Sequence, residues 1–260
     1  MDYQAVFMDI DGTLVTERQL VSSAREVVQR LNDRGYKVAL CTGRSTVHTN
    51  GVQKHLGIEN AVYFNGGLAV AHGDVTLSMP LEPSTVENIL KLTSDHRQPL
   101  ILHTRNRTLS LEEIPVEYQP ILESYQFPPI ERTTIDAVLS GTVGQIYQAN
   151  VFATRDFDHV FSEHIPECLV YRWNRNAIDL QRLGCDKSIG AQTFLHRWNI
   201  PPAQAVHIGD GGNDIGMFRT MGLSIAMGNA SDDVKANANV VTDRAENDGV
   251  LKALENLQLI

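Results

Sequence analysis

The chain has 260 residues, of which 42% are hydrophobic and 20% are charged, and its formal net charge at pH 7 is −9. These totals are those of a globular protein with one large domain or two smaller ones. The acidic balance argues against nucleic acid or an anionic membrane surface as a partner, and no stretch reaches the length of a membrane span.

Cysteine usage and the N-terminal sequence favour a reducing compartment, the cytoplasm. The three cysteines form no CxxC spacing, and no secretory signal is visible. Asn106 and Asn229 each begin a glycosylation sequon, but the sequons carry no weight without a secretion route.

Buried strands and helices alternate in the first part of the chain. Continuous apolar runs predict strands at Tyr3–Met8, Val38–Cys41 and Ala61–Phe64, and apolar residues at helical spacing predict a helix over Ser23–Arg34. Apolar strands separated by helices indicate a parallel sheet that is covered on both faces.

The last part of the chain repeats this alternation. We expect a helix over Asp186–Trp198, strands at Ala205–Ile208, Leu223–Met227 and Val240–Val241, and a closing helix that starts at Asp248. These elements can add to the same parallel sheet as the first part.

The middle of the chain has a different pattern, because its strands alternate in the manner of an antiparallel sheet. The expected strands are Ile101–His103, Gln145–Phe152, Leu169–Trp173 and Ala177–Leu183, with helices starting at Ser84 and Asp156. We therefore predict a doubly wound α/β core of residues 1–81 and 185–260, into which an α+β domain of residues 82–184 is inserted.

Polar and charged residues gather where the predicted parallel strands end, which is where ligands bind in open parallel sheets. The residues at these ends, with Lys187 at the start of a helix, are Asp9, Asp11, Thr42, Gly43, Arg44, Asn65, Asp210, Asn213 and Asp214. Such a set suits phosphoryl transfer, because carboxylates hold Mg²⁺ while hydroxyl, amide and cationic groups bind phosphate oxygens.

Taken singly, these features have ordinary structural readings. Asp11-Gly12 could form a hairpin turn, and Asp186 and Asp214 could be helix N-caps. A calcium loop starting at Asp210 fails on spacing, because the twelfth position is not glutamate. A Walker loop is excluded, because no Gly-Lys pair occurs in the chain.

Taken together, the motifs resemble a known family. Asp9–Thr13, Thr42–Arg44, Lys187 and Gly209–Asp214 resemble, in order and spacing, the four motifs of the haloacid dehalogenase-like superfamily. The inserted domain is similar to the α/β cap of the Cof-type phosphatases in that superfamily. The resemblance covers the whole chain, and one departure is Ser188, where many relatives carry glycine.

The resemblance implies a Mg²⁺-dependent phosphatase that forms an aspartyl phosphate. Asp9 would be the nucleophile and Asp11 the general acid and then the base, with Lys187 as a further catalytic residue. Mg²⁺ would be held by Asp9, by the backbone carbonyl of Asp11 and by Asp210. Asp214 would support the metal site without binding the ion directly. The implied phosphate-binding residues are Ile10, Thr42, Gly43, Arg44, Asn65, Lys187 and Asn213.

The expected substrate is a small phosphorylated metabolite, and sugar phosphates would suit the inserted domain. Its polar and aromatic stretch Tyr171–Asn176, and after it His103–Arg105, are the residues expected to contact the substrate. Two other functions stay open: a phosphomutase on the same scaffold, and a phosphometabolite sensor without activity. The short loop after Asp210 favours hydrolysis over the mutase, and the complete set of reactive residues argues against the sensor.

Overall fold

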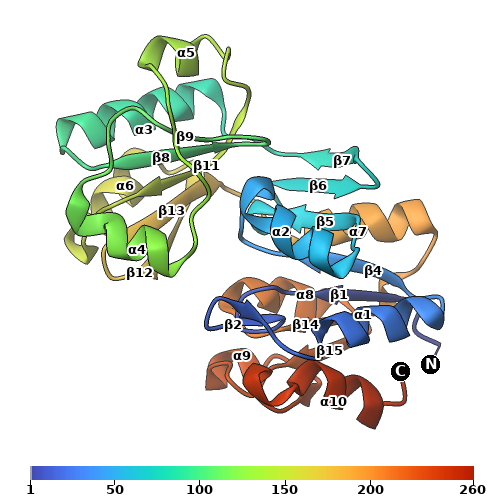
Figure 1. Cartoon of the computed structure of the whole chain (residues 1–260). Coiled ribbons are helices and arrows are strands. Elements are labelled where there is room, and N and C mark those ends of the chain that lie inside the picture. Colours follow the sequence, from blue (N-terminus) through green and yellow to red (C-terminus); the bar gives the residue numbers. More distant parts are fainter. Residues whose placement is uncertain (1) are drawn as a thin grey trace. The chain divides into compact units, whose positions relative to one another are not determined.

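The structure is a computed structural model that describes residues 2–260 (Figure 1). The chain divides into two compact units. Unit 1 comprises Met1–Arg44, Asn50–Ser78 and Asp186–Ile260, and unit 2 comprises Ser45–Thr49 and Met79–Cys185. That unit 2 works as a cap domain remains a prediction.

An eight-stranded sheet forms the centre of unit 1, with the order β16-β15-β14-β1-β4-β5-β6-β7. Neighbouring strands from β16 to β5 are parallel, which confirms the predicted α/β class, whereas β6 and β7 add an antiparallel edge that the sequence analysis did not anticipate. The strands are β1 (Ala5–Met8), β4 (Lys37–Cys41), β5 (Asn60–Tyr63), β6 (Leu68–Ala71), β7 (Asp74–Ser78), β14 (Ala205–Gly209), β15 (Leu223–Ala226) and β16 (Val240–Val241).

Helices cover this sheet and bury apolar side chains against it. Phe194 and Leu195 of α7 and Met217 of α8 pack in one cluster with Phe7 and Ala39 of the central strands. The helices are α1 (Ala24–Asp33), α2 (Thr46–Leu56, whose first residues belong to unit 2), α7 (Lys187–Trp198), α8 (Ile215–Thr220), α9 (Asp232–Lys235) and α10 (Gly249–Asn256), with 3₁₀ turns η1 (Phe64–Gly66), η4 (Pro202–Gln204), η5 (Gly212–Asp214) and η6 (Ala245–Asn247).

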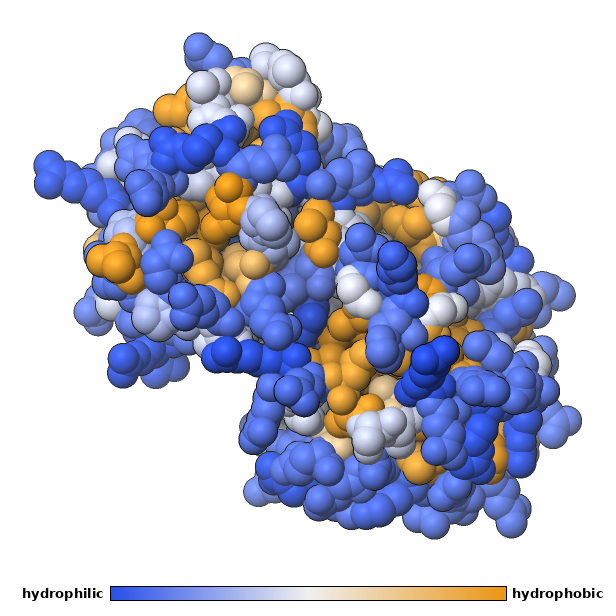
Figure 2. Space-filling view, viewed as in Figure 1, coloured by the Kyte–Doolittle hydropathy of each residue, from blue (hydrophilic) through white to orange (hydrophobic). Residues whose placement is uncertain are grey.

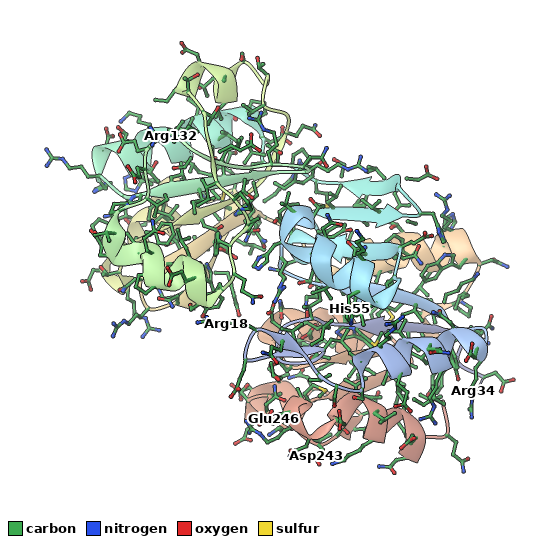
Figure 3. All side chains as sticks on the ribbon, viewed as in Figure 1. Arg18, Arg34, His55, Arg132, Asp243 and Glu246 are labelled. Atoms are coloured by element: carbon green, nitrogen blue, oxygen red, sulfur yellow. The ribbon has the colours of Figure 1, made fainter. Side chains whose placement is uncertain are left out.

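A short hairpin follows the first strand, but its turn does not lie at Asp11-Gly12. Strands β2 (Val15–Thr16) and β3 (Gln19–Leu20) pair antiparallel, and the turn residues Glu17 and Arg18 have φ of 46° and 68°. Positive φ at both central residues is the mark of a type I′ turn. Figure 3 shows Arg18 projecting from this turn. The structure therefore places a hairpin at the next turn along the chain, and the Asp11-Gly12 pair does not form one.

Unit 2 is built on a six-stranded sheet with the order β10-β9-β8-β11-β13-β12. Its neighbours pair antiparallel except for β9 and β10, which are parallel. The four strands predicted for this part of the chain are present, and two shorter ones join them. The bounds are β8 (Leu100–Thr104), β9 (Thr108–Ser110), β10 (Glu131–Arg132), β11 (Ile146–Val151), β12 (Cys168–Asn174) and β13 (Ala177–Arg182).

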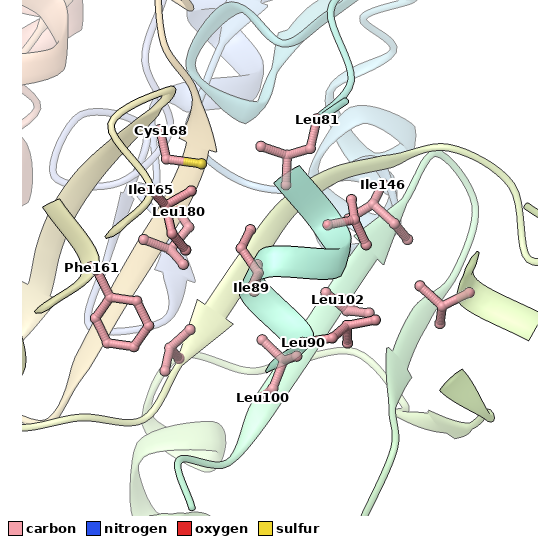
Figure 4. Close-up of a cluster of buried hydrophobic side chains, with 14 of the residues drawn as sticks. Leu81, Ile89, Leu90, Leu100, Leu102, Ile146, Phe161, Ile165, Cys168 and Leu180 are labelled. Atoms are coloured by element: carbon pink, nitrogen blue, oxygen red, sulfur yellow. The ribbon is translucent and has the colours of Figure 1, made fainter. Parts of the chain in front are cut away.

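One face of the unit 2 sheet packs against helices. Ile89 of α3, Phe161 of α6 and Leu180 of β13 lie in the same buried cluster (Figure 4). Pro120 lies in the first turn of α4, where proline fits because it removes no helical hydrogen bond. The helices are α3 (Pro83–Asp95), α4 (Gln119–Ser124), α5 (Ile135–Leu139) and α6 (Asp158–His164), with 3₁₀ turns η2 (Val116–Tyr118) and η3 (Arg155–Phe157).

A buried polar row crosses β8, β11 and β13 in unit 2. His103 Nε2 lies 2.5 Å from Asn150 Oδ1, and the Asn150 amide donates to the Asp179 carboxyl. Burial lowers the pKa of His103 to about 4 and raises the pKa of Asp179 to about 7, although the Asn150 hydrogen bond opposes the latter shift. Both groups are therefore neutral in the lower part of the physiological pH range.

Arg172, expected to contact the substrate, has a structural role instead. Its guanidinium forms an ion pair with Asp158 and donates to the backbone carbonyls of Ala153, Asn174 and Arg175, all within unit 2. These bonds fix the end of β12 against η3 and α6. Little of its donor capacity is left for a ligand.

The surface is mostly polar. The face in Figure 2 is predominantly hydrophilic with smaller hydrophobic areas, and Val116 is the most exposed of the large hydrophobic residues. No helix within residues 2–260 has the length and apolar character needed to cross a membrane.

We expect Asp179→Asn to change how stability depends on pH. Because folding raises the pKa of Asp179 from 3.8 to about 7, its stabilising contribution is complete below pH 3.8 and is lost as the pH rises through about 7. An amide cannot ionise. The free energy of unfolding of the wild type, minus that of the variant, should therefore fall by as much as about 4 kcal/mol between pH 4 and pH 8.

Urea unfolding of both proteins at several pH values measures this difference. The titration of His103 occurs in both proteins and largely cancels in the subtraction. A difference that stays constant with pH would show that Asp179 is ionised in the folded protein.

Candidate active site

A buried lysine brings two carboxylates together in unit 1. Lys187 is the first residue of α7, and its Nζ lies 2.8 Å from Asp9 Oδ1 and 2.8 Å from Asp214 Oδ1. All three side chains are buried. Asp186 accepts a hydrogen bond from the Ser188 N–H and caps α7, as one reading of the sequence expected, and this cap fixes where the lysine emerges.

Three aspartates form an acidic cluster around this lysine. Carboxylate oxygens of Asp9, Asp210 and Asp214 lie within 4.8 Å of one another. Burial raises the pKa of Asp9 well above its ordinary value, and the charges of Asp214 and Asp210 act in the same direction. Burial and the Asp214 charge also raise the pKa of Asp210 to about 6. A hard divalent cation fits this donor set. Such a cation prefers oxygen ligands, and its charge relieves the repulsion between the three carboxylates.

The lysine and the third aspartate keep their charges. Burial disfavours the charged form of Lys187, but the carboxylates of Asp214 and Asp9 outweigh it and raise its pKa. Burial also works against the Asp214 carboxylate, and Lys187 and the His207 hydrogen bond outweigh it and hold the pKa of Asp214 well below its usual range. The site therefore contains a buried ion pair of Lys187 and Asp214. Beside it lie Asp9 and Asp210, whose raised pKa values make them ionise less readily.

Asp214 occupies the N-cap position of α8, but its side chain makes no capping hydrogen bond to that helix. Its Oδ2 accepts the backbone N–H groups of Asp210 at 3.1 Å and Gly211 at 2.9 Å. Its Oδ1 accepts His207 Nε2 at 2.8 Å as well as Lys187. The expected bond to the N-terminus of α8 is absent, but Oδ2 caps the start of η5 through the Gly211 N–H. His207 was missed, because it looks like one more residue of the buried strand β14.

Asp11 lies apart from the acidic cluster. Its side chain is 61% exposed, and Arg44 donates to both of its oxygens, from Nε at 2.8 Å and from Nη2 at 2.5 Å. The carboxylate therefore points toward the guanidinium, and only the backbone of Asp11 is left for the predicted metal role. Arg44, predicted to bind phosphate, instead holds Asp11 in this structure.

The predicted phosphate-binding residues follow β4 and β5. Thr42 is buried, and its Oγ1 accepts the Arg44 N–H at 3.1 Å. Asn213 donates to Asn65 Oδ1 at 2.8 Å, and a Cβ on Gly43 would lie 3.0 Å from that same oxygen. The structure thus brings these amides and the glycine together.

Ile10 differs from the other predicted phosphate-binding residues. Its side chain is completely buried, and its carbonyl accepts the N–H groups of Thr13, Leu14 and Val15 in the turn after β1. Only the backbone amide of Ile10 is thus a candidate for binding phosphate.

The turn after β1 is fixed by two contacts to the later part of the chain. Gly12 has φ of +71°, and a Cβ there would lie 2.0 Å from Asp210 Oδ2, so only glycine fits. Asn229 donates to the Gly12 carbonyl at 2.9 Å and to Asp210 Oδ2 at 3.0 Å. The sequence offered no signal for this role, since Asn229 stood out only as part of a sequon.

Comparison with known proteins identifies a family. The model of the haloacid dehalogenase-like hydrolases matches residues 6–254. YkrA of Bacillus subtilis strain 168, named as a candidate phosphatase, is 26% identical over 266 residues and covers all of both chains. A phosphoglycolate phosphatase of Nitrosopumilus maritimus is 28% identical over 254 residues, which is 96% of this chain and 94% of that protein.

Among solved structures, a hypothetical protein from Geobacillus kaustophilus HTA426 superposes with a TM-score of 0.90. Its sequence is 31% identical, and the match covers 99% of this chain and 100% of that one. The similarity therefore extends through both units of the chain.

We expect Lys187→Met to destabilise the protein by about 3–5 kcal/mol, because it leaves the Asp9 and Asp214 carboxylates buried without a counter-charge. Urea unfolding in the absence of divalent cations measures this loss. The matched control is Lys54→Met on the exposed face of α2, which should change the free energy of unfolding by no more than about 0.5 kcal/mol. Equal stability of the two variants would contradict the assigned ion pairs.

Proposed function

Since the chain belongs to the haloacid dehalogenase-like hydrolases and is a phosphatase, we propose that it hydrolyses phosphate monoesters of small metabolites through an aspartyl phosphate on Asp9. The observation that carries the proposal is the position of Asp9. Its buried carboxylate lies at the end of β1, is bound through Oδ1 by Lys187 and lies within the acidic cluster.

In the first step, an oxygen of Asp9 attacks the phosphorus atom of the substrate. Lys187 holds Oδ1, which leaves Oδ2 as the attacking atom. The bond between phosphorus and the ester oxygen breaks. Asp11, which has left Arg44 and taken up a proton from solvent, gives that proton to the departing oxygen, and the alcohol is released. Thr42, the Gly43 amide, Asn65 and Asn213 are the proposed donors to the phosphoryl oxygens, and Lys187 neutralises their charge.

In the second step, water attacks the phosphorus of the aspartyl phosphate. Asp11, now a carboxylate, takes a proton from this water, and the bond between phosphorus and the Asp9 oxygen breaks. Inorganic phosphate leaves and the Asp9 carboxylate is restored. Asp11 thus acts as an acid in the first step, where it gives up a proton, and as a base in the second step, where it takes one.

The Arg44–Asp11 ion pair must open during this cycle. Both Asp11 oxygens accept from Arg44, so Asp11 can reach the departing oxygen only after it exchanges this partner. We infer that the dianionic phosphate of the substrate competes for the guanidinium, since arginine binds carboxylate and phosphate with the same paired geometry. Arg44 would then bind phosphate while Asp11 turns to the ester oxygen.

Mg²⁺ is the cofactor that suits the acidic cluster. Asp9 and Asp210 would hold it together with the backbone carbonyl of Asp11, and Asp214 would support the site from behind. When bound, the ion neutralises charge on the phosphoryl group and favours the ionised form of the nucleophile. Chemically, an oxygen donor set of this kind favours Mg²⁺ over softer metals.

The proposed substrates are small phosphorylated metabolites, with sugar phosphates among them. Support comes from the relatives, one of which is named as a phosphoglycolate phosphatase. With a net charge of −9, the protein as a whole repels such anions, so the local cations Arg44 and Lys187 have to provide the attraction. A screen of phosphate release across phosphorylated metabolites would identify the preferred substrate.

We expect excess chelator to abolish phosphate release and added Mg²⁺ to restore it. The nucleophile, Asp210 and the phosphate carry like charges, and without a cation their repulsion costs several kcal/mol. Ca²⁺ should restore less activity, because its larger and looser coordination misplaces the nucleophile. Undiminished activity in excess chelator would overturn the proposed metal role.

Asp9→Asn and Asp11→Asn should fail in different ways. Asp9→Asn should leave no measurable turnover, because an amide is a poor nucleophile. Asp11→Asn should be slower by about 10²–10⁴-fold, and it should accumulate the aspartyl phosphate because the attack of water lacks its base. Mass spectrometry after a rapid quench should find a phosphoryl group on the peptide that contains Asp9 in Asp11→Asn only. A phosphoryl group on another residue would refute the mechanism.

A further inference from the structure

A histidine that the proposed mechanism does not use lies directly behind the active site. His207 is the third residue of β14, is completely buried, and packs its ring against Phe218 at a centroid distance of 5.6 Å. Its Nε2 lies 2.8 Å from Asp214 Oδ1. A buried histidine could be simple core packing, but this contact connects it to the catalytic lysine.

The contact is one of four that fix the Asp214 carboxylate. Oδ1 accepts from His207 and from Lys187, each at 2.8 Å, and Oδ2 accepts the N–H groups of Asp210 and Gly211. Of these donors, Lys187 has a long side chain with four rotatable torsions, and the two amides belong to a loop. The imidazole is the only donor mounted on a strand in the centre of the sheet.

The direction of this hydrogen bond follows from the groups around Asp214. Its carboxylate already accepts Lys187 and two backbone N–H groups, so it can only accept from His207 Nε2 as well. His207 Nδ1 is buried without a hydrogen-bond partner, which places the single N–H of a neutral ring on Nε2. A neutral donor orients the carboxylate without adding positive charge, and the negative charge of the acidic cluster is retained for a cation.

We propose that His207 is a positioning residue of the active site, which orients Asp214 and, through Asp214, holds both the Lys187 ammonium and the Asp210–Gly211 loop in place. The inference rests on the proposed function, because it assigns Asp210 to a divalent cation and Lys187 to the nucleophile. Groups that orient metal-site residues from behind typically affect metal affinity or activity by about 10–100-fold when they are removed.

The test compares His207→Met with His207→Gln. Methionine fills similar space without a donor, whereas the glutamine amide can reach the place of Nε2 and donate. We expect the Mg²⁺ concentration that gives half-maximal phosphate release to rise about 10–100-fold in His207→Met and no more than about threefold in His207→Gln. Mg²⁺ should also raise the melting temperature, which is measured without substrate. The Mg²⁺ concentration that gives half of this rise should increase more in His207→Met than in His207→Gln.

Val206→Ala is the matched control for loss of packing. Val206 neighbours His207 in β14, is completely buried and points to the opposite side of the sheet. It should lower the melting temperature while its Mg²⁺ dependence stays within about twofold of the wild type. If Val206→Ala and His207→Met shifted the Mg²⁺ dependence equally, or if His207→Met shifted it not at all, the proposal would be overturned.

A second measurement uses the wild-type protein and does not depend on the folding of His207→Met. In ¹⁵N-histidine spectra, the signal that is absent from His207→Gln belongs to His207 among the nine histidines. The proposal requires the neutral form with the proton on Nε2, and a proton on Nδ1 alone would contradict it. Unchanged turnover in excess chelator would instead refute the metal role on which the inference rests, so the two failures are distinguishable.

Discussion

The buried ammonium of Lys187 is the interaction on which the rest of the site depends. It lies between the carboxylates of Asp9 and Asp214, and neither carboxylate could stay charged in the core without it. Because they come from the end of β1, the start of α7 and the loop after β14, the ion pairs also join the two separated halves of unit 1. The same contacts that stabilise this fold therefore also hold the carboxylate of Asp9, the proposed nucleophile, in place.

Charge balance explains why the surroundings of this ion pair are mostly neutral donors. One ammonium faces Asp9, Asp214 and Asp210, so the cluster keeps an excess of negative charge that raises the pKa of Asp9 and Asp210. The nearby hydrogen bonds come from His207, from Asn229 and from backbone amides, which fix geometry without cancelling that charge. A site arranged in this way attracts a cation and can still hold an anionic phosphate.

Unit 2 shows how polar residues can be misread when only their sequence is known. Arg172 lies in the densest polar and aromatic stretch of the chain, yet its guanidinium is saturated by Asp158 and three carbonyls. His103, which was expected to contact the substrate, is buried beside Asn150. Asp158 lies 14 residues from Arg172 and Asn150 lies 47 residues from His103, so side-chain chemistry alone could not show whether either residue faces solvent, a ligand or the core.

The sequence by itself determined the α/β class and most strands, because apolar periodicity is local. It also predicted the residues of the candidate site, because the carboxyl ends of parallel strands meet at one edge. Tertiary structure alone decided the antiparallel edge of β6 and β7, the hold of Arg44 on Asp11 and the roles of His207 and Asn229. These features depend on contacts between residues remote in the chain. Their energies come from burial and from hydrogen-bond partners, which exist only once the sheet has assembled.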